Sequence, residues 1–463
     1  MKVLLAMPPL PSDLSWTTKP EPPLGIAWVA ACLERAGHEA AVIDLNLEHS
    51  KAADAFARKM SSFAPDVVGV SMTTFTKNEC AAIASEARKQ GAFVLAGGAH
   101  PSLFPLDVLN SGSYDAVVVG EGEVTTTELV NALAEKRPLS QVQGIAFKHG
   151  SESVANPPRP YITDLDSLPF PARHLLSMRE YPEYRLSFLL EAPATTMCTS
   201  RGCPYRCAYC SSPVIWGRSW RGMGGKRVAD EMQHLRDEYG IRSIKFHEDH
   251  FTLKKERVMD ICAEIKKRKL DMPWQCEARV NNIDEERLNA MADAGCQVIW
   301  FGIESGTQKV LDFYRKDITL EQVRNAVTLS KKAGIKPIGS FILGAPIESE
   351  EEIKETIEFG LGLGLEDVYF NILAAFPGTD LYEYVKKNDF VGRYLCDGGL
   401  IEIEGKTPHS RVVELQRSAQ QRLDKRKLGS NWKKLLRYYA RQPTRLPSAA
   451  LKRGLKAALQ KGD

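Results

Sequence analysis

Three cysteines with short, unequal spacing are the residues of this sequence best suited to chemistry. Cys203, Cys207 and Cys210 follow the pattern Cys-x3-Cys-x2-Cys, and Cys198 lies five residues before the first of them. Thiolates this close together in sequence bind iron–sulfur clusters or zinc. With three protein ligands, a cubane cluster keeps one iron free for a substrate or cofactor, whereas a fourth ligand closes the site.

The position of Cys198 bears on this choice. It lies inside an expected strand, where alternate side chains point away from the following loop. A structural zinc site that uses Cys198 is the alternative, but zinc cysteines usually form two short-spaced couples well apart in sequence, and this chain has no such couples. The spacing therefore favours a cluster with three ligands and leaves Cys198 outside it.

Length and composition limit the setting of this chemistry. A chain of 463 residues is too long for one compact core and predicts two or three domains. The net charge of +3 gives no global basic field, so we expect no nucleic-acid partner. The apolar start breaks at prolines too early for a signal peptide. We expect a cytoplasmic protein, with peripheral contact at the inner face of the membrane as an alternative, in which the cysteines stay reduced.

Strand-like and helical stretches alternate through the first 150 residues. Apolar runs such as DVVGVSM (66–72) and AFVLAGG (92–98) are separated by helical patterns that stop at Gly37 and Gly91. This alternation predicts an α/β domain, a doubly wound Rossmann-like parallel sheet over 1–150. Ligands bind such sheets at the carboxyl ends of the strands. These ends are small, hydroxylated or glycine-rich here: SMTTFT, GGAHPS and GEGE.

The rest of the chain divides into three parts. Residues 151–190 are rich in proline and predict a linker. Strand–helix alternation resumes over 191–386, where half a dozen units suit a partial TIM-type (β/α) barrel with its chemistry at the strands' C-terminal ends. Residues 387–463 predict a small, basic helical C-terminal region.

An apolar stripe runs along that C-terminal region. Trp432, Leu435, Leu436 and Tyr439 recur at helical spacing, opposite a basic face. Such a helix can lie on an anionic membrane surface, or it can pack on its own domain with a solvated outer face.

The cysteine loop and several later motifs resemble the radical S-adenosylmethionine (radical SAM) family. The loop RGCPYRCAYCSSP includes the aromatic Tyr209 before the last cysteine, and further motifs follow in family order: FHEDHFT, CEARV, GIESG, GSFILGAP and FPGT. The N-terminal region resembles the cobalamin-binding domain of one large subgroup, through PPLGIAWVAACLERAGHEAAVIDL, GVSMTTFT, GGAHPSLFP and DAVVVGEGE. The likeness runs from about Met1 to Tyr384.

The resemblance implies three cofactors. Cys203, Cys207 and Cys210 would hold a [4Fe-4S] cluster whose open iron chelates the amino and carboxylate groups of SAM. An electron from a donor such as flavodoxin or ferredoxin would then cleave SAM to a 5′-deoxyadenosyl radical. The cofactor supplies the difficult chemistry, and the protein supplies orientation and excludes side reactions.

The resemblance also implies roles at the ends of the barrel strands. Glu248 would accept a hydrogen bond from the SAM ammonium, with Asp249 as the alternative, although a carboxylate here could instead cap the next helix. Arg279 would pair with the SAM carboxylate, or form a salt bridge across the barrel. Glu304 and Ser305 would contact the ribose hydroxyls, or simply form a turn.

Further contacts are implied around these. Tyr209 would belong to the cofactor site, and Ile342 and Gly344 would approach the adenine through their backbone. His247 and His250 flank Glu248, but no third ligand lies nearby in the sequence, so we interpret them as loop or supporting groups.

The N-terminal domain would bind cobalamin on its strand-end loops. The chain lacks the Asp-x-His-x-x-Gly pattern that supplies a histidine below the cobalt. We therefore expect cobalamin with its own base in the sheet cleft and a lower face without histidine, or else a vestigial domain that no longer binds it. The expected contacts are Ser71, Thr73, Gly97, Gly98, His100, Gly120 and Glu121.

This combination of cofactors implies methyl transfer to an unactivated carbon. The basic C-terminus favours a hydrophobic small-molecule substrate such as a tetrapyrrole, an isoprenoid lipid or a specialised metabolite. Alternatives are a radical SAM ring-forming or carbon–carbon bond-forming enzyme of the cyclase type, and, from another class, a non-catalytic cobalamin or metal sensor. A methylthiotransferase would need further N-terminal cysteines, and only Cys32 and Cys80 occur there.

Overall fold

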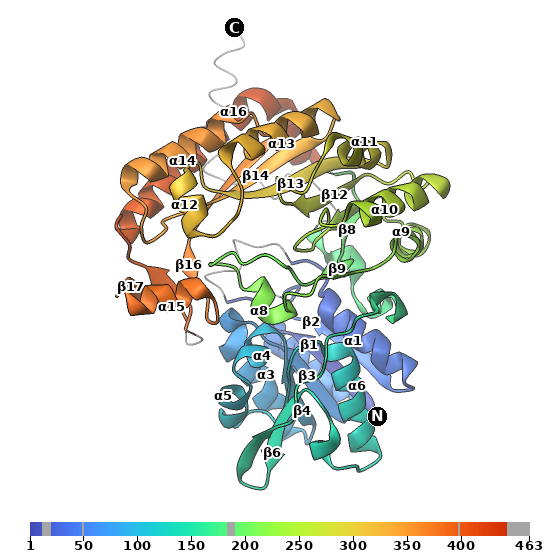
Figure 1. Ribbon diagram of the computed structural model, residues 1–463. Coiled ribbons are helices and arrows are strands. Elements are labelled where there is room, and N and C mark those ends of the chain that lie inside the picture. Colours follow the sequence, from blue (N-terminus) through green and yellow to red (C-terminus); the bar gives the residue numbers. More distant parts are fainter. Residues whose placement is uncertain (12–19, 49–50, 183–189, 397–398, 442–463) are drawn as a thin grey trace.

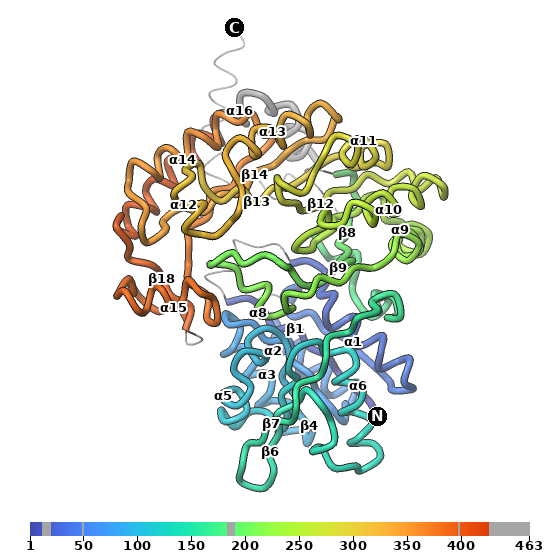
Figure 2. Tube along the Cα trace, in the orientation of Figure 1, coloured from blue at the N-terminus to red at the C-terminus, as the bar shows by residue number. Residues whose placement is uncertain are grey.

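The computed structural model describes residues 1–11, 20–48, 51–182, 190–396 and 399–441, with side chains up to residue 425. Two parallel sheets are built from different halves of the chain. The N-terminal sheet lies at one end of the molecule and the second sheet at the other, with the cysteine loop and α8 (Ser212–Trp216) between them (Figure 1; Figure 2).

The N-terminal sheet, sheet A, has the order β2-β1-β3-β4-β5-β6-β7, with parallel pairing from β2 to β5 and antiparallel pairing beyond. The order reverses between β1 and β3, which is where such sheets bind ligands. The strands are β1 (Lys2–Met7), β2 (Glu39–Asp44), β3 (Val67–Ser71), β4 (Phe93–Gly97), β5 (Ala116–Val118), β6 (Ile145–His149) and β7 (Glu152–Ala155).

Helices cover both faces of sheet A, which confirms the doubly wound prediction. Apolar side chains of α1 and α6 pack with Val3 and Leu5 on one face, and those of α2, α3 and α5 pack with Leu4 and Val68 on the other. The helices are α1 (Leu24–Arg35), α2 (Ala52–Phe63), α3 (Lys77–Lys89), α4 (Ala99–Leu103), α5 (Pro105–Asn110) and α6 (Gly122–Ala134). Sequence analysis did not predict the β6–β7 hairpin, which extends sheet A to Ala155.

After β7, the described part of the expected linker contains short 3-10 turns that pack on both halves of the chain. Arg173 is buried and bonds Glu231 of α9 (Gly225–Tyr239) at 3.1 Å. Tyr181 donates a hydrogen bond to Asp44 at the end of β2, at 2.9 Å. The proline-rich passage therefore joins the two halves through buried polar contacts.

Sheet B is the partial barrel. Its six parallel strands have the order β8-β11-β12-β13-β14-β15, so each new strand is added beside the previous one. The strands are β8 (Ala194–Met197), β11 (Ser243–Phe246), β12 (Trp274–Ala278), β13 (Cys296–Glu304), β14 (Lys336–Leu343) and β15 (Asp367–Ile372). Helices cover its outer side (Figure 1), as the barrel prediction requires: α9, α10 (Lys255–Lys267), α11 (Glu285–Asp293), α13 (Leu320–Lys332) and α14 (Glu350–Gly362). The short helix α12 (Gln308–Phe313) follows β13 and ends beside the cysteine loop.

The C-terminal region is less helical than expected. Strands β16 (Ala374–Ala375), β17 (Val391–Tyr394) and β18 (Ile401–Ile403) form a small antiparallel sheet beside α15 (Asp380–Lys387). Helix α16 (His409–Arg441) then lies along α14 and β15. The predicted apolar stripe falls on residues whose side chains lie outside the described set. Within the described part of the chain, no helix has the length and hydropathy needed to cross a membrane.

Candidate active site at the cysteine loop

The cysteine loop begins and ends at a two-strand clasp. It leaves β9 (Ser200–Arg201), passes through α8 (Ser212–Trp216) and returns in β10 (Arg221–Gly222), which pairs with β9 in antiparallel register. Gly202, with φ +82°, allows the tight exit, since a Cβ there would lie 2.4 Å from the carbonyl oxygen of Ser219. The loop therefore has a fixed base from which its cysteines project.

The three predicted ligand cysteines lie close to one another. All are half-buried free thiols, and the charges of Cys203 and Cys207 both act on the pKa of Cys210. Burial raises the pKa of Cys210 to about 12, so this thiol needs a metal to become a thiolate at neutral pH. Cys198 instead donates to the carbonyl of Ser200 at 3.4 Å.

Three sulfurs around one tetrahedral zinc lie about 4 Å apart. Among the residues that the structure describes, no three His, Cys, Asp or Glu side chains converge closely enough to hold one ion.

Arg279 lies against the cysteine loop. Its Nη1 donates to Cys207 Sγ at 3.3 Å, its Nη2 donates to the carbonyl of Lys316, and its guanidinium lies 3.7 Å from the centre of the Tyr205 ring. These three contacts hold the guanidinium beside the cysteine loop. The pairing with the SAM carboxylate stays a prediction.

Tyr209 and Glu304 form a buried polar group together with Lys316, a residue that the sequence motifs did not identify. Lys316 is buried and donates to Glu304 Oε1 at 2.7 Å, and the Tyr209 hydroxyl donates to the same oxygen at 2.9 Å. Burial, and then the Glu304 charge, raise the pKa of Tyr209 well above its ordinary value. Lys316 lies in the stretch YRKDIT, where nothing in the sequence distinguishes it from a surface lysine. The predicted ribose contact of Glu304 is untested.

Glu248 and Asp249 point to different places. Glu248 is buried and accepts a hydrogen bond from the Thr199 hydroxyl at 2.7 Å, while its Oε1 lies 3.6 Å from Arg257 and has no hydrogen-bond partner. Asp249 accepts a hydrogen bond from Ser212 of α8, and its charge acts on Cys203 and Cys210. Asp249, the alternative of the sequence analysis, is therefore the carboxylate nearer the cysteines.

The Ser305 hydroxyl is fully buried between two elements. Its Oγ lies 3.1 Å from Thr356 Oγ1 of α14 and accepts from the Thr307 backbone N–H at 3.2 Å. These contacts join the end of β13 to α14. The structure thus brings Glu304, but not the Ser305 hydroxyl, to the polar network beside the cysteines.

The end of β14 is held by a second residue that the sequence analysis missed. One oxygen of the fully buried Glu348 accepts hydrogen bonds from the backbone N–H groups of Gly344 and Ala345, at 2.8 and 3.0 Å. Burial raises its pKa to about 7. The Gly344 N–H is thereby occupied, and Ile342 packs with the cluster around Tyr314. Their adenine contacts stay predictions.

The expected cobalamin residues line the carboxyl ends of β3, β4 and β5. Thr73 and Thr76 cap a short turn after β3 through a 3.1 Å hydrogen bond. Gly98, with φ +107°, is essential to the packing, because a Cβ would lie 2.6 Å from the Met72 carbonyl oxygen. Gly120 has φ +77° and open space at its Cα, so a bulky ligand can approach its backbone. Ser71 and Gly97 are half-buried beside them.

The side chains of His100 and Glu121 already contact other side chains of the protein. His100 is buried, its Nδ1 lies 3.3 Å from Thr74 Oγ1, and burial lowers its pKa to about 4. Glu121 is also buried and bonds Arg201 at 3.0 Å and Arg221 at 2.7 Å, the two arginines of the clasp. Glu121 thus contacts the other half of the chain.

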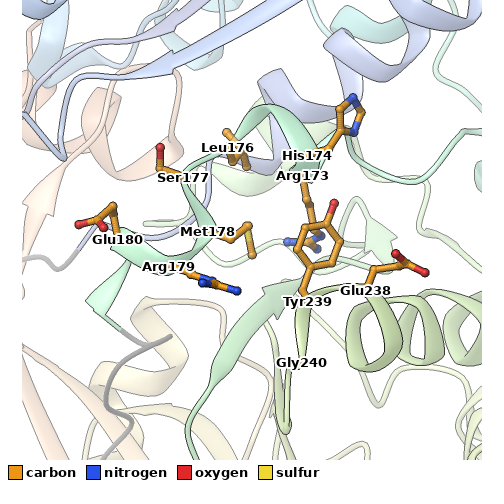
Figure 3. A pocket seen from close by; sticks show the side chains of 10 residues that line it. All are labelled: Arg173, His174, Leu176, Ser177, Met178, Arg179, Glu180, Glu238, Tyr239 and Gly240. Atoms are coloured by element: carbon orange, nitrogen blue, oxygen red, sulfur yellow. The ribbon is translucent and has the colours of Figure 1, made fainter.

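The structure also contains a cavity of about 560 Å³ (Figure 3). The 3-10 turns of the linker and the end of α9 line it, including Arg173, Met178 and Tyr239. None of the predicted site residues lines this cavity, so it takes no part in the site described above.

Two family models match the chain. Residues 197–360 match the radical SAM superfamily and residues 17–130 match the B12 binding domain. An uncharacterized methyltransferase, PH0819, of Pyrococcus horikoshii is 38% identical over 395 residues, 84% of each chain.

The chain belongs to the cobalamin-binding radical SAM family.

Other members of the family are more distant. Cytidylyl-2-hydroxyethylphosphonate methyltransferase of Streptomyces wedmorensis is 27% identical, over 85% of this chain and 84% of the relative. Anaerobic magnesium-protoporphyrin IX monomethyl ester cyclase of Rubrivivax gelatinosus is 28% identical, over 78% of this chain and 66% of the relative.

Solved structures share the fold of this radical SAM enzyme. The radical SAM methyltransferase TsrM of Kitasatospora setae, with cobalamin and a [4Fe-4S] cluster bound, gives a TM-score of 0.71 at 21% identity, over 84% of this chain and 78% of that one. The cobalamin-dependent enzyme OxsB gives 0.77 at 19% identity, over 95% and 71%. Family membership implies that the chain uses a [4Fe-4S] cluster, SAM and cobalamin.

Proposed function

We propose that this radical SAM enzyme transfers a methyl group to an unactivated carbon of a small molecule. The observation that carries the proposal is the grouping of three half-buried thiols, apart from Cys198, beside a second domain whose strand-end loops can hold cobalamin. The methyltransferases among the relatives support methyl transfer.

We assign the cluster to Cys203, Cys207 and Cys210. The donor set fits, because iron–sulfur clusters are held by cysteine thiolates. Three cysteine ligands on a four-iron cluster leave one iron open. When bound, the cluster and SAM supply a radical that removes hydrogen from carbon, and cobalamin supplies a methyl group. Closing the site against water protects such a radical.

The chain's own groups would orient SAM at the cluster. Asp249 is better placed than Glu248 to accept hydrogen bonds from the ammonium, because its charge lies near two of the cysteines. The buried His250 Nδ1 has no hydrogen-bond partner, and Glu248 Oε1 has only the 3.6 Å ion pair with Arg257, so both polar atoms on this loop can accept a further contact. Arg279 would donate a hydrogen bond to the sulfur of Cys207 and, with Tyr205, fix the loop.

Cobalamin would lie on the glycine-rich ends of sheet A. Open space at Gly120 fits a bulky ligand there. His100 is neutral, buried and bonded to Thr74, which supports a lower cobalt face without histidine. Glu121, the remaining expected contact, would act at the domain boundary.

The substrate proposed is a hydrophobic or flat molecule. On the side of sheet B opposite its helices, the rings of Trp300 and Tyr369 lie 4.7 Å apart, tilted by 31°, and Tyr369 is 38% exposed. Their strand neighbours Phe301 and Phe370 pack in the core, so the aromatic pair faces the barrel interior. A tetrapyrrole, an isoprenoid lipid or a specialised metabolite would suit this surface, and a flavodoxin or ferredoxin would supply electrons.

Anaerobic incubation of the reconstituted protein with SAM, reductant and hydroxocobalamin tests the proposal. We expect 5′-deoxyadenosine from the wild type and none from Cys207→Ala. Nucleoside formation by that variant would contradict the cluster assignment. A zinc-loaded, colourless protein would favour the sensor alternative.

A ring-forming enzyme is the second candidate, because cyclases of magnesium-protoporphyrin IX monomethyl ester are among the relatives. The mass of the product separates the two. Methylation adds a CH2 unit, whereas oxidative cyclisation removes hydrogen.

A further inference from the structure

Four buried charges join the N-terminal domain to the base of the cysteine loop. Glu121 and Glu123 lie at the start of α6, Arg201 lies in β9 and Arg221 lies in β10. Their side chains are between 4% and 6% exposed. Charges this deeply buried occur in proteins only when they are paired.

The pairing is complete and crosses the domain boundary. Arg201 bonds Glu121 at 3.0 Å through Nη1 and bonds Glu123 through Nη2, and Arg221 bonds the same Glu121 oxygen at 2.7 Å. Both carboxylates come from one domain and both guanidinium groups from the other. Two charges of each sign leave no net charge in the buried group.

Aromatic rings from both halves surround Arg201. Its guanidinium carbon lies 5.0 Å from the ring of Trp28 in α1 and 5.5 Å from that of Trp216 in α8. Stacking on flat faces and the fork of donors restrict the orientation of an arginine far more than that of a lysine. The guanidinium therefore has one defined position.

The placement of the four residues connects the two cofactor regions. Glu121 follows Gly120, at the end of β5, where the cobalamin loops are. Arg201 lies two residues before Cys203, and Arg221 closes the same clasp. One buried group thus ties a cobalamin loop to both ends of the segment that carries the cysteines.

We propose that Arg201 and Arg221 are positioning residues that fix the distance between the cluster and cobalamin. Buried ion pairs add little net stability compared with apolar packing, and their best-attested use is to specify one arrangement of the parts they join. The inference rests on the proposed function, because it needs both cofactors to be bound.

A positioning role affects reactions that need both domains and spares a reaction that needs the cluster domain alone. Cleavage of SAM to 5′-deoxyadenosine takes place at the cluster alone. Movement of the SAM methyl group to cobalamin needs the two sites in register, and a misplacement of about 1 Å can cost about 100-fold in rate. Loosening the clasp should therefore slow the second reaction and spare the first.

Arg201→Lys in the reconstituted holoenzyme is the test. A lysine keeps the charge but cannot bond both carboxylates in a fork. Arg88→Lys is the matched control, since Arg88 bonds Asp115 at 2.8 Å within the N-terminal domain and is 43% exposed. Pulsed EPR on the reduced cluster and cob(II)alamin reads their separation directly, and absorption with labelled SAM reads methyl transfer to cobalamin.

We expect Arg201→Lys to broaden the cluster–cobalt distance distribution and to slow methyl transfer by about 10- to 100-fold. Its iron content, cobalamin content and rate of 5′-deoxyadenosine formation should stay within about twofold of the wild type, and Arg88→Lys should match the wild type throughout.

Three results would overturn the inference. An unchanged distribution of cluster–cobalt distances in Arg201→Lys would contradict the positioning role and leave the proposed function standing. Loss of cluster or cobalamin from the variant would make Arg201 a binding residue instead. A wild type that binds no cobalamin would overturn the proposed function, and the inference with it. If Arg201→Lys does not fold, Glu123→Gln, which keeps the side-chain shape and the Arg201–Glu121 pair, gives the same comparison.

Discussion

The strand ends of the two parallel sheets are built differently. Those of sheet A expose backbone, with glycines at Gly97, Gly98 and Gly120. Those of sheet B carry buried charged side chains that are already bonded to one another, as Glu304 is to Lys316. A backbone surface is sensitive to added volume, whereas a buried polar network is sensitive to the loss of one partner.

Substitutions test this contrast, and the largest effect is expected at the cysteine loop. Cys210→Ala should leave the reconstituted protein without its cluster, because two thiolates do not hold a cubane against loss. Cys198→Ala should keep about four iron atoms per chain, since Cys198 bonds Ser200 rather than the other cysteines. Iron and sulfide analysis measures both, and equal loss in the two variants would contradict a three-cysteine site.

Lys316→Met tests the side-chain network of sheet B. Removing the lysine leaves the Glu304 charge buried, which costs about 3–5 kcal/mol of unfolding free energy. Urea unfolding measures the loss. The double variant Lys316→Met with Glu304→Gln should recover part of it, and a double variant as unstable as the single one would show that the pairing is unimportant.

Glu348→Gln tests protonation of a separate buried carboxylate, the one that holds the end of β14. The folded-state pKa of about 7 lies above the ordinary value of 4.5, so the folded chain binds the proton more tightly than the unfolded chain does. The stabilisation is therefore full below about pH 4.5 and is lost as the pH rises towards 7, by about 3 kcal/mol at most. Unfolding of the glutamine variant at several pH values should show this part of the slope removed.

Gly98→Ala tests the backbone surface of sheet A. The positive φ and the 2.6 Å approach to the Met72 carbonyl should together cost about 2 kcal/mol and weaken cobalamin binding. Gly91→Ala is the control, because its φ is +81° but its Cα faces open space. Melting temperature and cobalamin absorption after gel filtration measure the difference, and equal behaviour of the two variants would show that only φ matters.

The sequence predicted most of the fold because the long β/α alternation is periodic. It did not predict the β6–β7 hairpin, whose strands include the polar stretch KHGSESVA, or the β17–β18 pair near the C-terminus. Short edge strands of polar residues have no apolar period to identify them. Their pairing depends on the neighbouring strand.

The site residues likewise fall into those that the sequence predicted and those that it did not. Motif spacing identified Cys203, Cys207 and Cys210 as one group, and placed Glu304 and Arg279 at strand ends. It gave no reason to select Lys316, Glu348 or the Arg201–Glu121 pair, because each depends on a contact with a residue far away in the chain.

The sequence by itself therefore predicted the cysteine ligand set and determined the order of strands and helices, because both follow from local spacing and hydrophobic period. The tertiary structure decided that Asp249 rather than Glu248 lies nearer the cysteines and that Glu121 binds across the domain boundary. The direction in which a charged side chain turns depends on which partner relieves its burial, and that partner is known only once the chain has folded.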